Sequence, residues 1–153
     1  LSGFGEKVRL YVERGGAALV ATGPKSAALG REPVSGMKVT ASKIASRGSQ
    51  RYFTALGADP TFPSLRRAGR LDGVRFFEAA AIEPDKTGVV IAAKLEDDSP
   101  LLLEKKLGEG KVIVFASPLD NVANDFPVKP GFVPFVEQTA AYLGRVEESS
   151  TVY

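Results

Sequence analysis

The stretch at residues 100–120, PLLLEKKLGEGKVIVFASPLD, predicts how the sheet of this protein is built. Two apolar runs, 101–103 and 111–116, flank a Gly-Glu-Gly turn, which is the spacing of a β-hairpin. The first run continues into Glu-Lys-Lys, whereas residues 112–116 (VIVFA) are apolar on both faces. A strand without a polar face must be covered on both sides, so we expect residues 112–116 to form a central strand.

The residues that follow this strand, SPLD at 117–120, are the first place to expect a binding site. Open α/β sheets carry ligands beyond the carboxyl ends of their strands, and Asp120 is the side chain to test first. A role in the hydrogen bonding of its own loop is the simpler interpretation of Asp120. The candidate ligand-binding residues here and after an earlier strand are Gly23, Lys25, Ser117, Asp120 and Asn121.

Asn124 and Asp125 place further oxygen donors close to Asp120, and such donors suit Mg²⁺ or Ca²⁺. Their spacing matches no calcium-binding loop, and Asp and Asn are also ordinary turn residues. We therefore expect no metal site and no cofactor. Lys25, and Lys111 after the Gly-Glu-Gly turn, lack the surrounding pattern of a phosphate-binding loop, so exposed loop and turn positions are expected for them.

The composition is that of an ordinary folded domain, with 44% hydrophobic and 25% charged residues among 153. The chain contains no cysteine and no histidine. Disulfides, zinc-thiolate sites, thiol nucleophiles and Ser-His-Asp arrangements are therefore excluded. Chemistry by carboxylates, Lys or Tyr remains open, as does a divalent cation bound through oxygen.

The N-terminal part has the pattern of half a β-α-β unit. A helix is expected to end at Gly15-Gly16, and residues 17–22 (AALVAT) follow as a short apolar strand. The apolar face of this helix is expected to consist of Phe4, Val8, Tyr11 and Val12. The strand that should precede the helix is missing or lies upstream, and the chain opens with Leu1 rather than Met. We therefore expect a fragment of a longer protein.

Residues 25–72 hold no sustained hydrophobic period and are punctuated by Gly and Pro. Short helices and loops are expected there, with helical turns at 50–57 and from Phe62. Basic residues outnumber acidic ones eight to two between Pro33 and Phe77. The densest cluster is Arg66, Arg67 and Arg70.

A solvated basic face is the simplest interpretation of this cluster. The net charge of +2 is far from that of a nucleic-acid-binding domain, so nucleic acid is not expected as a partner. An anion- or nucleic-acid-binding surface between Lys38 and Arg75 stays open as an alternative, and it predicts binding that weakens with salt.

Two further strands, at 74–82 and 88–95, precede the hairpin and are separated from it by short polar turns. This arrangement predicts an antiparallel β-meander in the C-terminal half. Because residues 17–22 have the character of a parallel strand, the sheet as a whole is expected to be mixed.

Apolar residues at helical spacing predict a last helix at about 133–143, ended by Gly144. Residues 1–144 are then a single domain, and residues 145–153 are a tail or linker.

Five segments of this chain resemble one bacterial family: residues 14–20 (RGGAALV), 100–104 (PLLLE), 108–112 (GEGKV), 115–120 (FASPLD) and 132–135 (FVPF). The resemblance covers roughly residues 1–24 and 72–144. It is to the soluble domain near the C-terminal end of membrane proteins of the Bat aerotolerance type. Those proteins have N-terminal transmembrane helices, usually a von Willebrand factor A-like domain, and then a domain similar to class I glutamine amidotransferases.

The resemblance implies an α/β fold, a flavodoxin-like and amidotransferase-like sandwich. It also implies a parent protein in the bacterial cell membrane, with this domain soluble and on the extracytoplasmic side. The Cys-His-Glu triad of the resembled glutaminases is not available to a chain without Cys and His, so no catalytic residue carries over. The fold by itself does not give a function.

Two hypotheses of different classes follow. The first is a non-catalytic interaction or scaffolding domain of a membrane-anchored protein, whose partners are other protein domains or subunits of a membrane complex. The alternative is a small-molecule or divalent-metal-binding domain, which could be hydrolytic, with its site at the Asp120 loop. The absence of Cys and His favours the first.

Overall fold

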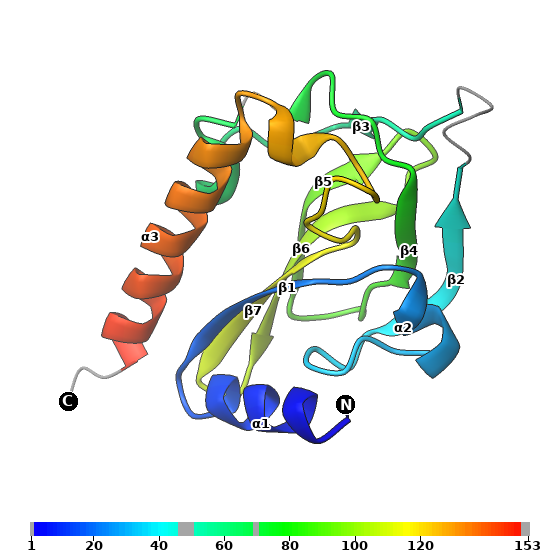
Figure 1. The fold of residues 1–153 in the computed structure, drawn as a ribbon. Coiled ribbons are helices and arrows are strands. Elements are labelled where there is room, and N and C mark those ends of the chain that lie inside the picture. Colours follow the sequence, from blue (N-terminus) through cyan, green and yellow to red (C-terminus); the bar gives the residue numbers. More distant parts are fainter. Residues whose placement is uncertain (1, 46–50, 69–70, 151–153) are drawn as a thin grey trace.

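The computed structural model describes residues 2–45, 51–68 and 71–150, and it has a mixed α/β architecture (Figure 1). A five-stranded sheet has the order β1-β7-β6-β5-β3, and β2 and β4 form a separate two-stranded sheet. The strands are β1 Ala17–Ala21, β2 Lys38–Ile44, β3 Ala55–Leu56, β4 Glu78–Glu83, β5 Val89–Leu95, β6 Pro100–Leu107 and β7 Gly110–Phe115. The helices are α1 Ser2–Glu13, α2 Pro24–Leu29 and α3 Phe132–Ser150, with short 3-10 helices η2 Pro63–Leu65 and η4 Phe126–Val128.

Strand β7 is central, as the sequence predicts. It lies between β1, to which it is parallel, and β6, to which it is antiparallel. Ile113 and Phe115 pack in the core cluster that also holds Phe135 of α3, whereas Val112 and Val114 pack in the cluster on the side of α1. Both faces of β7 are therefore covered, and the expected mixed sheet is confirmed.

The antiparallel meander is confirmed for β5, β6 and β7, but the expected first member of it is wrong. The strand expected at 74–82 begins at Glu78, and as β4 it pairs with β2 rather than with β5. The N–H of Ala80 donates to the carbonyl of Ala116 at 2.8 Å, which holds β4 against the end of β7. Hydrogen bonding to the loop after β7 has taken the place of pairing with the next strand along the chain.

The segment at 25–72 contains more regular structure than the sequence indicates. Strand β2 was not expected, because its sequence KVTASKI buries Val39 and leaves most other side chains exposed or half-exposed. The helical turn expected at 50–57 is wrong for the described residues from 51 on, where β3 pairs with β5. The helical turn expected from Phe62 is confirmed as η2.

Helix α1 is confirmed, but its expected apolar face is only partly buried. Val12 is fully buried, whereas the side chains of Phe4 and Tyr11 remain 70% and 50% exposed. Val12 belongs to the same buried cluster as Val112 and Val114 of β7, and Val8 packs against this cluster, so only this part of the expected apolar face contacts the sheet.

Helix α3 does not end at Gly144 but continues to Ser150, so the expected tail is helical up to that residue. Residues 151–153 lie outside the described residues. A glycine inside a helix costs about 1 kcal/mol relative to alanine, which contacts elsewhere can offset. Here Glu147, beyond the glycine, accepts hydrogen bonds from the Tyr11 hydroxyl and, at 3.3 Å, from the N–H of Ala17.

Candidate functional site

The carboxyl ends of β1 and β7 lie at the same edge of the sheet, because the two strands are parallel neighbours. Gly23 follows β1 and packs against Pro118, which follows β7. A Cβ on Gly23 would stand 2.6 Å from the Cγ of Pro118, so this approach requires glycine. The structure thus brings Gly23 to the segment that begins at Ser117, whereas Lys25 and Asn121 are exposed.

Ser117 and Asn124 form a buried hydrogen-bond network behind this edge. The Ser117 Oγ donates to the carbonyl of Glu78 at 2.7 Å and accepts from Asn124 Nδ2 at 2.8 Å. The same Nδ2 donates to the carbonyl of Pro118 at 2.6 Å, and Asn124 Oδ1 accepts from the N–H of Phe126 at 3.1 Å. Both side chains are fully buried, so they hold the loop rather than face a ligand.

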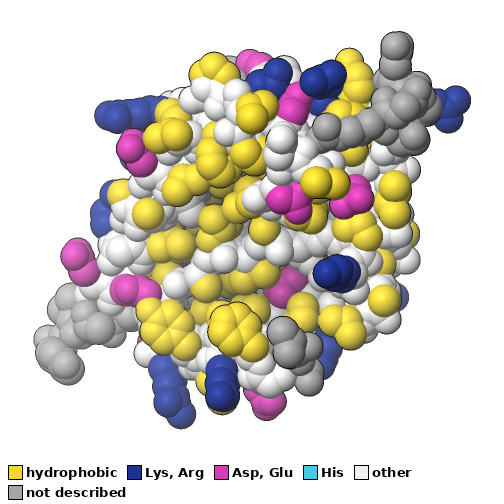
Figure 2. Space-filling model, in the orientation of Figure 1, with side chains coloured by type: hydrophobic (Ala, Val, Ile, Leu, Met, Phe, Trp, Pro, Cys, Tyr) yellow, Lys and Arg dark blue, Asp and Glu magenta, His cyan; other side chains and the backbone are white. Residues whose placement is uncertain are grey.

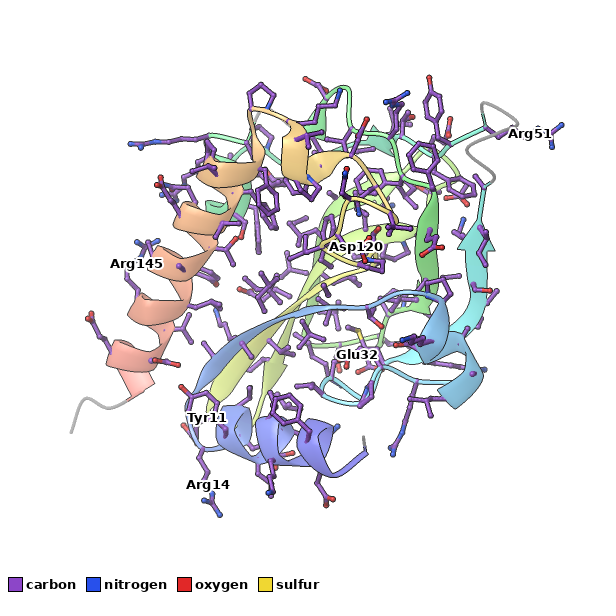
Figure 3. All side chains as sticks on the ribbon, in the orientation of Figure 1. Tyr11, Arg14, Glu32, Arg51, Asp120 and Arg145 are labelled. Atoms are coloured by element: carbon purple, nitrogen blue, oxygen red, sulfur yellow. The ribbon has the colours of Figure 1, made fainter. Side chains whose placement is uncertain are left out.

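Asp120 is exposed and binds its own loop (Figure 3). Its Oδ1 accepts from the N–H of Val122 at 2.9 Å and from the N–H of Ala123 at 2.7 Å. A carboxylate that accepts from backbone N–H groups two and three residues later is an ordinary stabiliser of a turn. The carbonyl of Ala123 in turn accepts from the N–H of Phe77 at 2.7 Å, which ties the loop to the segment before β4.

Asp125 is engaged in an ion pair with Arg75. Asp125 Oδ2 lies 2.7 Å from Arg75 Nε, its Oδ1 accepts from the Arg75 N–H at 2.6 Å, and Lys129 Nζ is 3.7 Å away. Burial acts to raise the pKa of Asp125, but the hydrogen bonds from Arg75 and the charge of Lys129 outweigh it and hold the pKa below its ordinary value. Asp125 therefore stays ionised as a structural partner of Arg75.

The oxygen donors after β7 are therefore not assembled as a cation site. Within residues 2–45, 51–68 and 71–150, no group of three or more Asp, Glu, His or Cys side chains is placed to hold a metal ion. The metal-binding alternative gains no support from this geometry.

The basic cluster is only partly described. Arg66 and Arg67 are exposed just after η2, and Arg70 lies outside the described residues. Neither Arg66 nor Arg67 lines the cavities considered next.

A polar cavity of about 1070 Å³ lies beside α1 and the loop after α2. Acidic and basic side chains both line it, and two of its cations are paired within the chain: Lys105 Nζ lies 2.6 Å from Asp85, and Arg9 Nε lies 3.1 Å from Glu13. Paired charges of both signs give this cavity no clear preference for an anion or a cation.

A second hollow, a groove of about 630 Å³, runs along β1 and is bounded by α1 and by residues 32–34. Among its lining residues only Glu32 is charged, and both Glu32 carboxylate oxygens accept backbone N–H groups, from Val34 at 2.8 Å and from Ser35 at 2.7 Å. Figure 2 shows hydrophobic side chains gathered on the face along which β1 runs. Neither the groove nor Glu32 was expected, although the apolar sequence at 17–22 was the available signal.

A further polar cluster, also not expected, joins α3 to the sheet. The Tyr142 hydroxyl donates to Glu104, and Lys111 Nζ lies 3.8 Å from Glu104 Oε2. Burial and the hydrogen bond to Glu104 raise the pKa of Tyr142, so its phenol remains protonated at neutral pH. These contacts tie Tyr142 of α3 to Glu104 of β6 and Lys111 of β7.

No protein-family model matches this sequence, and no curated protein does either. Solved structures do share the fold. The cytoplasmic protein STM3548 from Salmonella typhimurium matches with a TM-score of 0.68 and 16% identity, over 90% of this chain and 59% of that chain. A second cytoplasmic protein, STM1381 from Salmonella typhimurium LT2, matches with a TM-score of 0.61 and 14% identity, over 95% of this chain and 60% of that one.

The cold-adapted β-galactosidase from Rahnella sp. R3 also contains this fold, with a TM-score of 0.61 and 15% identity. The match covers 93% of this chain and 21% of the β-galactosidase chain. This chain therefore spans less than two thirds of each of these proteins. At such identities the likeness extends to the fold alone. In the described part of the chain, no helix has the length and apolar character needed to span a bilayer.

Proposed function

We propose that this protein is a non-catalytic interaction domain that binds another polypeptide. The observation that carries the proposal is that the polar side chains at the carboxyl end of β7 are engaged by their own chain. Ser117, Asn124 and Asp125 are buried and hydrogen-bonded, and Asp120 caps its own turn. The described region where this architecture ordinarily carries a ligand is thus occupied by structural contacts.

The composition supports the same proposal. Without Cys and His, the chain lacks the groups on which acyl-transfer enzymes most often depend. A domain of the amidotransferase-like type, held in a membrane-anchored parent protein and contacting other subunits there, remains our interpretation of the family resemblance. The β-galactosidase match gives a case in which this fold makes up 21% of a larger chain.

The test is an activity assay on the purified domain with amide, ester and phosphate-ester substrates, run beside the Asp120→Ala variant. We expect no turnover above the buffer rate for either protein. Turnover that disappears in Asp120→Ala would overturn the proposal. A matched variant, Asp59→Ala, removes a carboxylate that likewise accepts from a nearby backbone N–H, at 2.9 Å from Thr61, and controls for a general effect of charge.

A thermal-shift series addresses the small-molecule and metal alternative. We expect Mg²⁺, Ca²⁺, nucleotides and sugars to leave the melting temperature unchanged. A ligand that binds the folded state and is present at 100 times its Kd would add about 2.7 kcal/mol to the free energy of unfolding, so binding would be visible as a higher melting temperature. Stabilisation by one of them that is lost in Asp120→Ala would favour the alternative over our proposal.

A further inference from the structure

The polar cavity beside α1 has walls from separate parts of the chain. Helix α1 supplies Glu6 and Arg9, the loop after α2 supplies Arg31, and Asp85 and Lys105 close it from the side of β5 and β6. Its volume of about 1070 Å³ is at the upper end of the range of ligand sites, roughly 300–1,000 Å³. The cavity therefore has room for a short segment of another chain.

The inner part of this cavity is fixed by contacts of the chain with itself. Lys105 Nζ lies 2.6 Å from Asp85, it donates to the carbonyl of Ser35 at 2.6 Å, and only 16% of the Lys105 side chain is exposed. Arg9, which is paired within α1, also donates to the carbonyl of Val34 at 3.4 Å. These contacts tie the loop after α2 to β6 and to α1, so the cavity does not need a ligand to form it.

Glu6 and Arg31 are the lining charges that remain. Both side chains are exposed, and none of the ion pairs within the described part of the chain includes either of them. They have opposite signs and come from different elements. A ligand with charge of one sign pairs with one of them and meets a like charge at the other, whereas a ligand with both signs pairs with both.

Apolar surface lies beside these charges in the same lining. Leu29, at the end of α2, is 66% exposed, and Pro33 is half-buried. Exposed ion pairs contribute little affinity by themselves and mainly select the partner. A partner therefore gains from an apolar side chain that covers Leu29 between the two charge contacts.

We propose that this cavity binds a segment of a partner polypeptide that carries a basic, an apolar and an acidic side chain. The basic side chain pairs with Glu6, the acidic one pairs with Arg31, and the apolar one covers Leu29. The proposal rests on the proposed function and names the surface and the kind of segment through which it acts. Binding of an isolated short segment is weak, and its selectivity lies in the charge pattern.

The test titrates the purified protein with three tripeptides that are acetylated and amidated at their ends, and it follows the backbone amide resonances. The probes are Lys-Leu-Glu, Glu-Leu-Glu and Lys-Leu-Lys, which differ only in side-chain charge. We expect Lys-Leu-Glu to shift the resonances of Glu6, Arg31 and Gly36 and to bind about three- to fivefold more tightly than the other two. Free glycine, a zwitterion without a side chain, should not shift them.

Variants at the two exposed charges assign the contacts. Glu6→Gln and Arg31→Gln should each weaken the binding of Lys-Leu-Glu about three- to fivefold, as expected for one exposed ion pair. Glu6→Lys makes both charges positive and should turn the preference to Glu-Leu-Glu. Lys7→Gln and Glu137→Gln are the matched controls, because these exposed charges do not line the cavity, and they should leave binding unchanged.

Equal affinity for the three peptides, or shifts that spare Glu6, Arg31 and Gly36, would overturn the inference. A preference for Lys-Leu-Glu that survives in Arg31→Gln would also overturn it. Glycine bound as tightly as the peptide would replace the polypeptide by a small zwitterion. A dimer in sedimentation velocity that is abolished by Arg31→Gln would replace it by a second copy of this chain.

The two proposals fail separately. Unshifted resonances around the cavity, together with no turnover by the protein, would remove the mixed-charge segment and leave the interaction domain to act through another surface. Turnover that depends on Asp120 would defeat the proposed function whatever the peptides do.

Discussion

Replacing Asn124 by Ala tests whether the loop after β7 is held together by its own side chains. Asn124→Ala removes the donor to Ser117 Oγ and to the carbonyl of Pro118, and it leaves the buried N–H of Phe126 without its acceptor. Each lost hydrogen bond has a net worth of about 0.5–1.5 kcal/mol, and an unsatisfied buried group costs about 1–3 kcal/mol. We therefore expect a loss of about 2–4 kcal/mol in the free energy of unfolding.

Urea denaturation followed by circular dichroism measures this loss, with an unchanged m-value as a check on two-state behaviour. Val128→Ala is the control, because Val128 follows the same loop and its side chain is 68% exposed, and its effect should stay within about 0.5 kcal/mol. A loss below about 0.5 kcal/mol for Asn124→Ala would refute the reasoning, since the buried hydrogen bonds of Asn124 would then add almost nothing to the free energy of unfolding.

A double-mutant cycle with Ser117→Ala sharpens the same test. The two side chains share one hydrogen bond, so the double variant should lose less than the sum of the single variants by about 0.5–1.5 kcal/mol. Strict additivity would mean that Ser117 and Asn124 act independently, contrary to the geometry.

Three further predictions concern the packing and the titration of single residues. Gly110→Ala should lower the free energy of unfolding by about 1–3 kcal/mol, because the new Cβ would stand 2.1 Å from the Gly16 carbonyl oxygen. Gly144→Ala, which has open space around it in α3, should raise the free energy of unfolding by about 0.5–1 kcal/mol. Urea melts in which both variants shift in the same direction would contradict this pair of predictions. The lowered pKa of Asp125 gives a contribution to folding stability that is present above its unfolded pKa of about 3.9 and is lost as pH falls. Asp125→Asn should therefore lose less stability than the unmodified protein on acidification. Parallel curves of stability against pH would argue against the ion pair. The raised pKa of Tyr142 gives a contribution to folding stability that is present below about pH 10 and is lost as pH rises further. Tyr142→Phe should therefore lose less stability in alkali than the unmodified protein. An identical alkaline decline in the two proteins would count against this role of Tyr142.

The sequence predicts well the elements whose burial is complete. Strand β7 and the hairpin with β6 could be predicted from the apolar run at 112–116 and from the turn glycines, because a run that is apolar on both faces is stable only where both faces are covered. Strand β1 and helix α1 are predicted from other signals, the apolar run at 17–22 and the Gly15-Gly16 helix end, although both elements are only partly buried. In these segments local pattern and tertiary environment agree.

The elements that the sequence did not reveal are those whose pairing depends on distant groups. Strand β2 has one fully buried apolar side chain, Val39, and gains its place by pairing with β4, so its own pattern carries little signal. Strand β4 does not join the meander; the N–H of Ala80 instead donates to the carbonyl of Ala116, which is distant in sequence. In the extension of α3 past Gly144, Glu147 contacts Tyr11 and Ala17, which are distant in sequence.

At the candidate site, too, the sequence predicts the local contacts and misses those that depend on distant segments. Topology correctly directed attention to the carboxyl end of β7, and the simpler interpretation of Asp120 as a turn residue fits its contacts with Val122 and Ala123. The buried roles of Ser117 and Asn124 required knowledge of where β4 lies, which the sequence did not provide. The groove along β1 depends on α1 and residues 32–34 together, so no single segment indicates it.

In the described part of the chain, the loop after β7 is closed by its own hydrogen bonds, whereas Leu19 and Ala21 of β1 have no strand paired on their outer side. Amide hydrogen exchange of the free protein at single-residue resolution measures both at once. We predict strong protection for the N–H groups of Ala18, Val20 and Phe126, and fast exchange for those of Leu19 and Ala21. Protection of Leu19 and Ala21 equal to that of Ala18 and Val20, or fast exchange at Phe126, would contradict it.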